Sequence, residues 1–385
     1  MFVCCWIYNY FVRLTRDGFI SRNDMCYALV ELKENNTWLK DYHSKMLQMV
    51  ATTLVNSEKT ILALRKKGYK TGKLHFKNHL NFNSFTYNQS GFRLEKHGQT
   101  NLLWLSKIGY TEIRLHRNVG EIKQITIMKR AGNWYAVICC NSAYVIPKII
   151  DFTTSVGIDV GIKNFVYDSD GNQTSNPKNL QTMLKPLVRI QRKVSRRKKG
   201  SNNRLKSILK MQKIHAKIAN RRKDFQHKLS TQYAKNNDVV FVEKLKPLNM
   251  VKNHRLAQSI MDASWRTFVQ KLEYKCKLLV EVPARNTTVD CSRCGNKVPK
   301  SLAIRIHRCN KCNLVVDRDY NASINILQKG LEIFNLSAKI DYNDGGGRIP
   351  QELWELTPVE IPKGSRKQEA SNIFRYIDSS PGLNI

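Results

Sequence analysis

Four cysteines in the last third of this 385-residue chain have the types and spacing of a metal site. Cys291 and Cys294 form one CxxC pair, Cys309 and Cys312 form a second, and 14 residues separate the two pairs. Two such pairs, each on a tight turn, supply the four thiolates that Zn²⁺ binds in a tetrahedron. Four coincidental core cysteines or a redox CxxC pair are the alternatives. The spacing favours a closed structural zinc site, and because four thiolates complete the shell, we expect His307 to be a surface residue.

Three acids stand beside apolar runs, where a carboxylate is costly to bury without a cation or hydrogen-bond donors. Asp159 lies in VGIDVG, Glu243 follows the apolar run of VVFVEKL, and Asp319 precedes a helix-forming run in VVDRDYNASINIL. Each acid also has an ordinary explanation. Asp159 could end a strand, and Asp319 could cap the helix that follows it. Glu243 could pair with Lys244 or Lys246.

Taken together, the three acids predict hydrolytic chemistry. Carboxylates at the ends of buried strands, in a strongly basic protein, would hold Mg²⁺ against a phosphate backbone. Two such ions, about 3.5–4 Å apart, activate a water molecule and stabilise the leaving oxygen in phosphodiester hydrolysis. We therefore expect Asp159, Glu243 and Asp319 to be catalytic ligands of two Mg²⁺ ions, with Zn²⁺ as a structural cofactor.

A third set of residues is cationic. Residues 185–230 contain 17 lysines and arginines and a single acid, Asp224. A solvated helix face is usually balanced by acids one turn away, and here such acids are almost absent, so nucleic-acid contact is favoured. Contacts of this kind give affinity for the phosphate backbone but no sequence information. The side chains that we expect to bind nucleic acid are Arg189, Arg192, Lys193, Arg196, Arg197, Lys198, Lys199 and Arg204.

The composition of the whole chain agrees with a polyanionic partner. Lys and Arg number 65 against 30 Asp and Glu, a formal net charge of +35, and the sequence pI is about 9.9. Such a chain repels itself unless nucleic acid neutralises it. Hydrophobic residues make up 42% and charged residues 25%, which excludes collagen-like, low-complexity and disordered classes. The length suggests two or three domains.

No apolar run reaches the roughly 18–20 residues of a membrane span, so we expect no membrane partner. The apolar start MFVCCWIYNYFV has no basic segment before it and no small-residue cleavage site, which favours buried structure over a signal peptide. The six cysteines outside the zinc pairs lie in apolar or helical contexts. This use of cysteine predicts a reducing compartment and an intracellular, cytoplasmic or nucleoid-associated protein that is not secreted.

The elements that must position these residues change in type along the chain. Residues 1–75 show helical periodicity, with Leu47, Val50, Leu54 and Ile61 at helical spacing. Residues 84–150 contain short runs rich in Ile, Val, Thr and aromatics between Gly or Asn, which predict a small barrel or sandwich. Aromatic side chains among the basic residues of 82–135 could stack on bases, although core positions are the more common use of strand aromatics.

The second half is predicted to alternate strands and helices. Residues 155–172 predict two strands, the first bracketed by Gly157 and Gly161, and 238–246 predicts a buried strand. Two basic helices joined by a loop at 200–203 lie between them. One helix is expected to carry Trp265, Phe268, Val269, Leu272, Cys276 and Leu279 on a single face. A short final helix over NASINILQKG precedes residues 331–385, which we expect to be a disordered tail with a net charge of −2.

The segments GIDVG, FVEKL and CSRCG…CNKC…DRDYNASINIL together resemble the TnpB/OrfB family of insertion sequences and the related Fanzor and type V CRISPR nucleases. The resemblance covers roughly residues 80–328. It implies a RuvC-like nuclease core of RNase H fold, split around a zinc ribbon. By match, Asp159, Glu243 and Asp319 take the first, second and third RuvC positions, and Asp317 has no catalytic role.

The resemblance also implies a domain plan and partners. The fold class is α+β multidomain, with a helical recognition-like segment at 1–78 and a wedge-like β-barrel at 79–150. The RuvC-like core would occupy 151–287 and 313–330, with the basic helices at 185–230, and the zinc ribbon 288–312. Family members usually have a leading strand and helix before an aromatic-Asn element, which here is WIYNYFV near residue 1, so we expect an N-terminus truncated relative to the family. The partners would be a double-stranded DNA target and a guide RNA that reads its sequence by base pairing.

The function predicted from these features is a metal-dependent, RNA-guided DNA endonuclease encoded by a transposon. The main alternative is a DNA-binding accessory or regulator of transposition that does not cleave. A transposase that joins strands itself is a third candidate. The sequence has no pair of histidines around an apolar residue with a nucleophilic tyrosine, which weakens the tyrosine type of strand joining.

Overall fold

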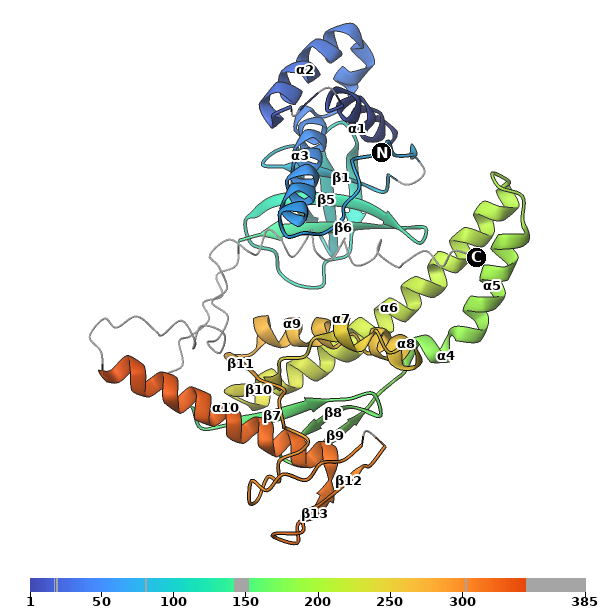
Figure 1. Cartoon of the computed structure of the whole chain (residues 1–385). Helices are drawn as coiled ribbons and strands as arrows, with labels where there is room; N and C mark the ends of the chain where they lie inside the picture. The colour runs from blue at the N-terminus through green and yellow to red at the C-terminus, as the bar shows by residue number, and fades with distance from the viewer. Residues whose placement is uncertain (17, 19, 80–81, 142–151, 302, 344–385) are drawn as a thin grey trace. The chain divides into compact units, whose positions relative to one another are not determined.

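The computed structural model describes residues 1–16, 18, 20–79, 82–141, 152–301 and 303–343 (Figure 1). The chain divides into two compact units. The first combines Met1–Val145 with Pro186–Ala216, and the second combines Ile146–Lys185 with Lys217–Ile385. The two units are described one at a time.

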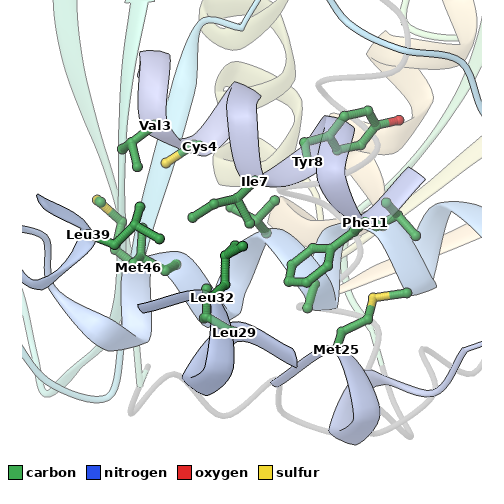
Figure 2. Packing of buried hydrophobic residues seen from close by; sticks show 14 of the residues in the cluster. Val3, Cys4, Ile7, Tyr8, Phe11, Met25, Leu29, Leu32, Leu39 and Met46 are labelled. Carbon is green, nitrogen blue, oxygen red and sulfur yellow. The ribbon is translucent and has the colours of Figure 1, made fainter. Parts of the chain in front are cut away.

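The first unit begins with helices, as the periodicity predicts. They are α1 (Phe2–Leu14), α2 (Arg22–Asn35), the 3-10 helix η1 (Thr37–Asp41) and α3 (Ser44–Lys66). Val3, Ile7 and Phe11 repeat every four residues on α1 and are buried, so the apolar start of the chain is core structure. Figure 2 shows Phe11 on the side of Met25 of α2, whereas Val3 lies at the other end of the same cluster, towards Leu39 and Met46.

Six strands follow in the first unit. They are β1 (Ser84–Asn88), β2 (Phe92–His97), β3 (Thr100–Leu105), β4 (Gly109–Ile113), β5 (Ile122–Arg130) and β6 (Asn133–Cys140). Their antiparallel ladders form two three-stranded sheets, β1-β5-β6 and β2-β3-β4. Among the described residues no ladder joins the two sheets, so the closed barrel stays a prediction. The strand β3 is an addition to the predicted elements.

The second unit is built on a five-stranded mixed sheet. Its strands are β7 (Ser155–Val160), β8 (Asn164–Asp168), β9 (Gln173–Ser175), β10 (Val239–Glu243) and β11 (Leu278–Val282). The order across the sheet is β11-β10-β7-β8-β9. β7, β8 and β9 form an antiparallel meander, whereas β10 pairs in parallel with both β7 and β11.

Helices and a small hairpin complete the second half of the chain. The helices are α4 (Asn179–Thr182), α5 (Leu184–Arg196), α6 (Asn202–Asn236), α7 (Pro247–Met250), α8 (His254–Ala263), α9 (Trp265–Lys275) and α10 (Arg318–Asn343). The hairpin consists of β12 (Ile306–Arg308) and β13 (Val315–Asp317).

The two faces of the five-stranded sheet pack against different helices. Val156 and Ile158 of β7 and Val240 of β10 belong to a core cluster with residues of α6, α8 and α9. The opposite face carries Phe241 of β10, which packs with Ile326 of α10. Because side chains alternate along a strand, the acids two residues beyond Gly157 and Phe241 lie on the α10 face.

Two glycines permit the close approach of α10. A Cβ atom on Gly157 would lie 2.6 Å from the backbone nitrogen of Leu327 and would also meet the carbonyl oxygen of Ser323. A Cβ on Gly330 would lie 2.7 Å from Cε1 of Phe241. Gly157 therefore lies inside β7, where the helix backbone passes, and does not precede the strand as the sequence predicted.

Two helix boundaries also differ from the sequence prediction. The apolar helix predicted to reach Leu279 ends at Lys275, and Leu279 belongs to β11. A short apolar run such as LLVEV fits a helix or a strand equally well by periodicity, and here pairing with β10 decides it. The final helix is longer than predicted, since α10 continues to Asn343 through part of the predicted disordered tail. Residues 344–385 lie outside the described residues.

We predict that Gly157→Ala destabilises the second unit by about 1–3 kcal/mol, the usual cost of overpacking a well-packed core. The new methyl group would meet the backbone of α10, which cannot rotate away as a side chain could. Chemical denaturation followed by circular dichroism measures the change. Gly72→Ala is the matched control, because its Cβ would have only Nε2 of His75 within 4 Å, at 3.8 Å. An equal effect of both substitutions would contradict the close packing.

Candidate functional site

The four predicted zinc ligands come together in the structure. The sulfur atoms of Cys291 and Cys312 lie 3.6 Å apart, and those of Cys294 and Cys309 lie 3.5 Å apart. All four sulfur atoms are within 4.8 Å of one another. Zn–S bonds of about 2.3 Å in a tetrahedron place sulfur atoms about 3.8 Å apart, so the cluster fits Zn²⁺.

Each cysteine pair closes a turn of the same form. The backbone N–H of Gly295 donates to the carbonyl of Cys291, and that of Asn313 donates to the carbonyl of Cys309. Both residues follow the second cysteine of their pair and have positive φ, 70° for Gly295 and 57° for Asn313. Glycine and asparagine are the residues that enter this region most easily. The turn predicted at Gly295 is present, and Asn313 makes its counterpart.

The prediction for His307 is wrong. Its side chain is fully buried, and its Nδ1 lies 2.7 Å from Nζ of Lys300, which also donates to the carbonyl of Thr288. Burial, followed by the charge of Lys300, lowers the pKa of His307. The neutral ring therefore accepts a hydrogen bond from the Lys300 ammonium at Nδ1. It is a packing residue of the hairpin β12–β13, whose interior the four thiolates alone do not fill.

The three acids converge from separate parts of the chain. Asp159 is the last residue but one of β7, Glu243 ends β10, and Asp319 is the second residue of α10. In the parallel ladder Phe241 pairs with Gly157 and Val242 with Ile158, so the residues that come next are Glu243 and Asp159. All three acids are at most 9% exposed. Three buried carboxylates thus lie at the α10 face of the sheet, and their role as metal ligands stays a prediction.

The acids of this cluster influence one another electrostatically. Burial, and then the charges of Glu243 and Asp319, raise the pKa of Asp159 well above its usual range, while Arg318 lowers it. Burial also raises the pKa of Glu243, and a hydrogen bond from Thr287 opposes that rise. A buried carboxylate whose pKa is raised by two neighbouring acids lies in a site that a cation would stabilise.

Two arginines form ion pairs with Asp319, one of the three acids. Nη2 of Arg318 lies 2.9 Å from one oxygen of Asp319, and Nη1 of Arg305 lies 3.5 Å from the other. Asp317 caps the helix, since its side chain accepts the backbone N–H of Asp319 at 2.8 Å. The capping role considered for Asp319 therefore belongs to Asp317, and the side chain of Asp319 pairs with the two arginines instead.

The acid cluster is more open than the thiolate cluster. Among the described residues, only the four cysteines form a group of three or more His, Cys, Asp or Glu side chains whose ligand atoms all lie within 4.8 Å of one another. The oxygen atoms of the three acids are therefore farther apart than the four sulfur atoms. The carboxylates fit hard cations by their chemistry, since Mg²⁺ prefers oxygen ligands and keeps several waters.

Sequence reasoning did not single out the residues that support the acids. Thr287 is buried and donates its hydroxyl to Glu243. Asn321 and Asn325 of α10 are buried and bond to the segment before the first cysteine pair. The sequence did contain a signal for Asn321 and Asn325. Asparagine is unfavourable inside a helix, and two asparagines four residues apart lie on one face, which indicates a polar contact made by that face.

The basic side chains divide into two groups. Arg197 donates to Oγ of Ser207 at 2.7 Å, and Arg204 donates to the carbonyl of Val194 at 3.3 Å, so both brace the turn between α5 and α6. Arg197 and Arg204 therefore stabilise the fold, whether or not they also contact nucleic acid. The exposed members of the predicted set are Arg189, Arg192, Lys193, Arg196, Lys198 and Lys199.

Among the described residues, no helix is both long and apolar enough to cross a membrane.

Comparison with known families gives two matches. Residues 146–254 match the OrfB_IS605 family, described as "Probable transposase". Residues 265–326 match a second family, described as "Cas12f1-like, TNB domain". The first match contains Asp159 and Glu243, and the second contains the four cysteines and Asp319.

Individual relatives cover most of the chain. A Streptomyces pristinaespiralis protein named "Putative RNA-guided DNA endonuclease" is 35% identical over 319 residues, which cover 79% of this chain and 76% of the relative. An Escherichia coli K12 protein named "Putative RNA-guided DNA endonuclease InsQ" is 30% identical over 362 residues, 88% of each chain. The protein of a solved Cas12f1–sgRNA–target DNA complex has a similar fold, with a TM-score of 0.50 at 16% identity, over 84% of this chain and 80% of that one.

We predict about one zinc per chain, lost in Cys294→Ser and in Cys309→Ser. A short cysteine-rich hairpin has too few apolar residues to fold without its metal, so the segment that leads to Asp319 should lose protection from hydrogen exchange in both variants. Metal analysis by mass spectrometry measures the zinc. Cys276→Ser, at a buried cysteine outside the cluster, is the control and should keep zinc. Full zinc occupancy in both cluster variants would contradict the assignment.

Proposed function

This chain belongs to the TnpB/OrfB family, and we propose that it is an RNA-guided DNA endonuclease that hydrolyses phosphodiester bonds at a RuvC-like, two-metal site. The observation that carries the proposal is the convergence of Asp159, Glu243 and Asp319 on one face of one sheet. These acids lie about 80 residues apart along the chain, and burying them together would be unfavourable without cations.

The order of the sheet supports a RuvC-like core of RNase H fold. Its first three strands form an antiparallel meander, and two parallel strands extend the sheet from β7. The two central parallel strands carry Asp159 and Glu243 near their carboxyl ends. A site at the carboxyl ends of adjacent parallel strands is where ligands commonly bind in open α/β sheets.

In this proposal the three acids bind the metal ions, and Arg305 and Arg318 give up their ion pairs with Asp319. Bound Mg²⁺ would activate water and neutralise the leaving oxygen. Asp159 and Glu243 would supply oxygen ligands from the sheet, and Asp319 would supply one from the start of α10. Because both oxygens of Asp319 have arginine partners, Arg305 and Arg318 would compete with the cations for it.

The nucleic-acid partners rest on charge and on the relatives. Six exposed cations on the α5 segment and the loop that follows it give a surface for phosphate contacts that carries no sequence information. The relatives' names specify RNA-guided cleavage of DNA. We therefore propose a guide RNA and a double-stranded DNA target for this chain, and hence a function inside the cell.

The non-cleaving regulator is the alternative that the experiments below distinguish. A non-cleaving regulator would be favoured by the loss of a metal-ligating residue. The chain has all three acids and all four cysteines, so this argument for a regulator does not apply.

We predict that reversing exposed cations weakens binding to all nucleic-acid sequences alike. In Arg192→Glu/Arg196→Glu/Lys199→Glu the affinity should fall, and its dependence on salt should flatten, because each phosphate contact releases counterions. Fluorescence anisotropy across a salt series measures both quantities. Lys107→Glu/Lys311→Glu/Arg308→Glu, which reverses exposed cations elsewhere, is the control for net charge. Equal losses in the two triple variants would mean that α5 is not a specific surface.

We predict that Asp159→Ala, Glu243→Ala and Asp319→Ala each reduce cleavage on the order of a hundredfold or more, since each removes a metal ligand. Binding of DNA should persist, because the cations provide most of the affinity. The assay supplies guide RNA, target duplex and Mg²⁺, and chelation of Mg²⁺ should stop it.

The neighbouring acid provides the control for the third position. Asp317→Asn should be milder than Asp319→Ala, since an amide oxygen still caps α10. Wild type and Asp159→Ala cutting at equal rates would contradict the nuclease assignment. A wild type that binds target and guide but cuts no DNA in Mg²⁺ or Mn²⁺ would favour the regulator.

A further inference from the structure

The loop between β11 and the first cysteine pair places a hydroxyl against Glu243. Thr287 is 2% exposed, and its Oγ1 donates to Oε1 of Glu243. A second acceptor, the carbonyl of Ala284, lies 3.4 Å away. A hydroxyl has one proton, and a bond to a carboxylate is shorter and stronger than one to a neutral carbonyl. The proton of Thr287 is therefore directed at Glu243.

The backbone of the same residue is fixed by α10. The carbonyl of Thr287 accepts from Nδ2 of Asn325 at 2.7 Å, and the same Nδ2 donates to the carbonyl of Asp290 at 2.8 Å. One turn earlier on α10, Asn321 also donates to the carbonyl of Asp290 at 2.8 Å, and its Oδ1 accepts from the backbone of Ser292 at 3.0 Å. These contacts hold the loop against the helix at several points.

The contacts make a continuous path between two of the acids. Glu243 is held by Thr287, Thr287 is held by Asn325, and Asn325 lies on the helix that begins beside Asp319. No backbone ladder connects β10 to α10, so their relative position depends on side-chain contacts and on packing. Thr287 is the point where this path reaches a carboxylate.

We propose that Thr287 is a positioning residue that orients Glu243 relative to Asp319 for binding of a divalent cation. The proposal rests on the proposed function, because it assumes that these acids are the metal ligands. Groups that hydrogen-bond to metal ligands fix their orientation, and their loss costs about 10–100-fold in metal affinity. In this proposal Thr287 is not itself a metal ligand and acts through its hydrogen bond to Glu243.

The test compares two substitutions at one buried position. Thr287→Val keeps the volume and removes the hydroxyl, whereas Thr287→Ser keeps the hydroxyl and removes a methyl group. Thr288→Val makes the same chemical change one residue later, where the side chain forms no hydrogen bond within the described residues. Mn²⁺ binding to the full chain without nucleic acid is measured by isothermal titration calorimetry, and zinc content is measured in parallel.

We expect Thr287→Val to bind Mn²⁺ about 10–100-fold more weakly than wild type. Thr287→Ser should recover most of the affinity, Thr288→Val should bind as wild type does, and all variants should keep their zinc. In the cleavage assay Thr287→Val should need more Mn²⁺ for half-maximal rate and recover at high Mn²⁺. A loss that is due only to packing would not be reversed by the serine.

Failure of this proposal and failure of the proposed function are read from different variants. Asp159→Asn should lose Mn²⁺ binding if the acids are the metal site, and unchanged binding in that variant would overturn the site and this proposal with it. If Asp159→Asn loses binding while Thr287→Val binds as wild type does, the positioning role alone is wrong. A Thr287→Ser variant as weak as Thr287→Val would also overturn it.

Discussion

The close passage of the α10 backbone over Gly157 is the constraint on which the second unit depends. Only a residue without a Cβ leaves room there for the carbonyl of Ser323 and the nitrogen of Leu327. Because the helix lies so near the sheet, its first turn reaches the ends of β7 and β10. Asp319 can then join Asp159 and Glu243, although the chain between them contains several helices and a cysteine-rich hairpin.

This packing brings like charges together, and arginines of the same chain offset part of that charge. Burial and the charges of Glu243 and Asp319 raise the pKa of Asp159, while Arg318 and Arg305 form ion pairs with Asp319. Arg318 comes from α10 itself, whereas Arg305 comes from the segment that leads into β12. The compensation is therefore shared between the sheet-packed helix and the cysteine-rich hairpin, and the charge of the acid cluster is linked to the fold of that hairpin.

The sequence could predict features that follow from local periodicity and spacing, and it failed where distant contacts decide. The CxxC spacing is enough to group four thiols, and the apolar runs are enough to place Asp159 and Glu243 in buried strands. The register of β7 and β10, which the sequence does not reveal, puts the two acids on one face. Leu279 was assigned to a helix because its run is too short for periodicity to discriminate, and pairing with β10 settled it. His307 was expected at the surface because four thiolates complete the zinc shell, and the spacing of the cysteines does not reveal its contact with Lys300.

The cysteine-rich hairpin is better regarded as part of the proposed nuclease site than as an appendage to it. The chain on its amino-terminal side supplies Thr287 to Glu243, and the chain between its two cysteine pairs supplies Arg305 to Asp319. These two contacts act on Glu243 of β10 and Asp319 of α10, and neither acts on Asp159 of β7. A metal ion bound by the four cysteines would fix the two pairs relative to each other and so limit the motion of both contacts. Such a metal would need no chemistry of its own, because its effect on the acids would be transmitted through Thr287 and Arg305.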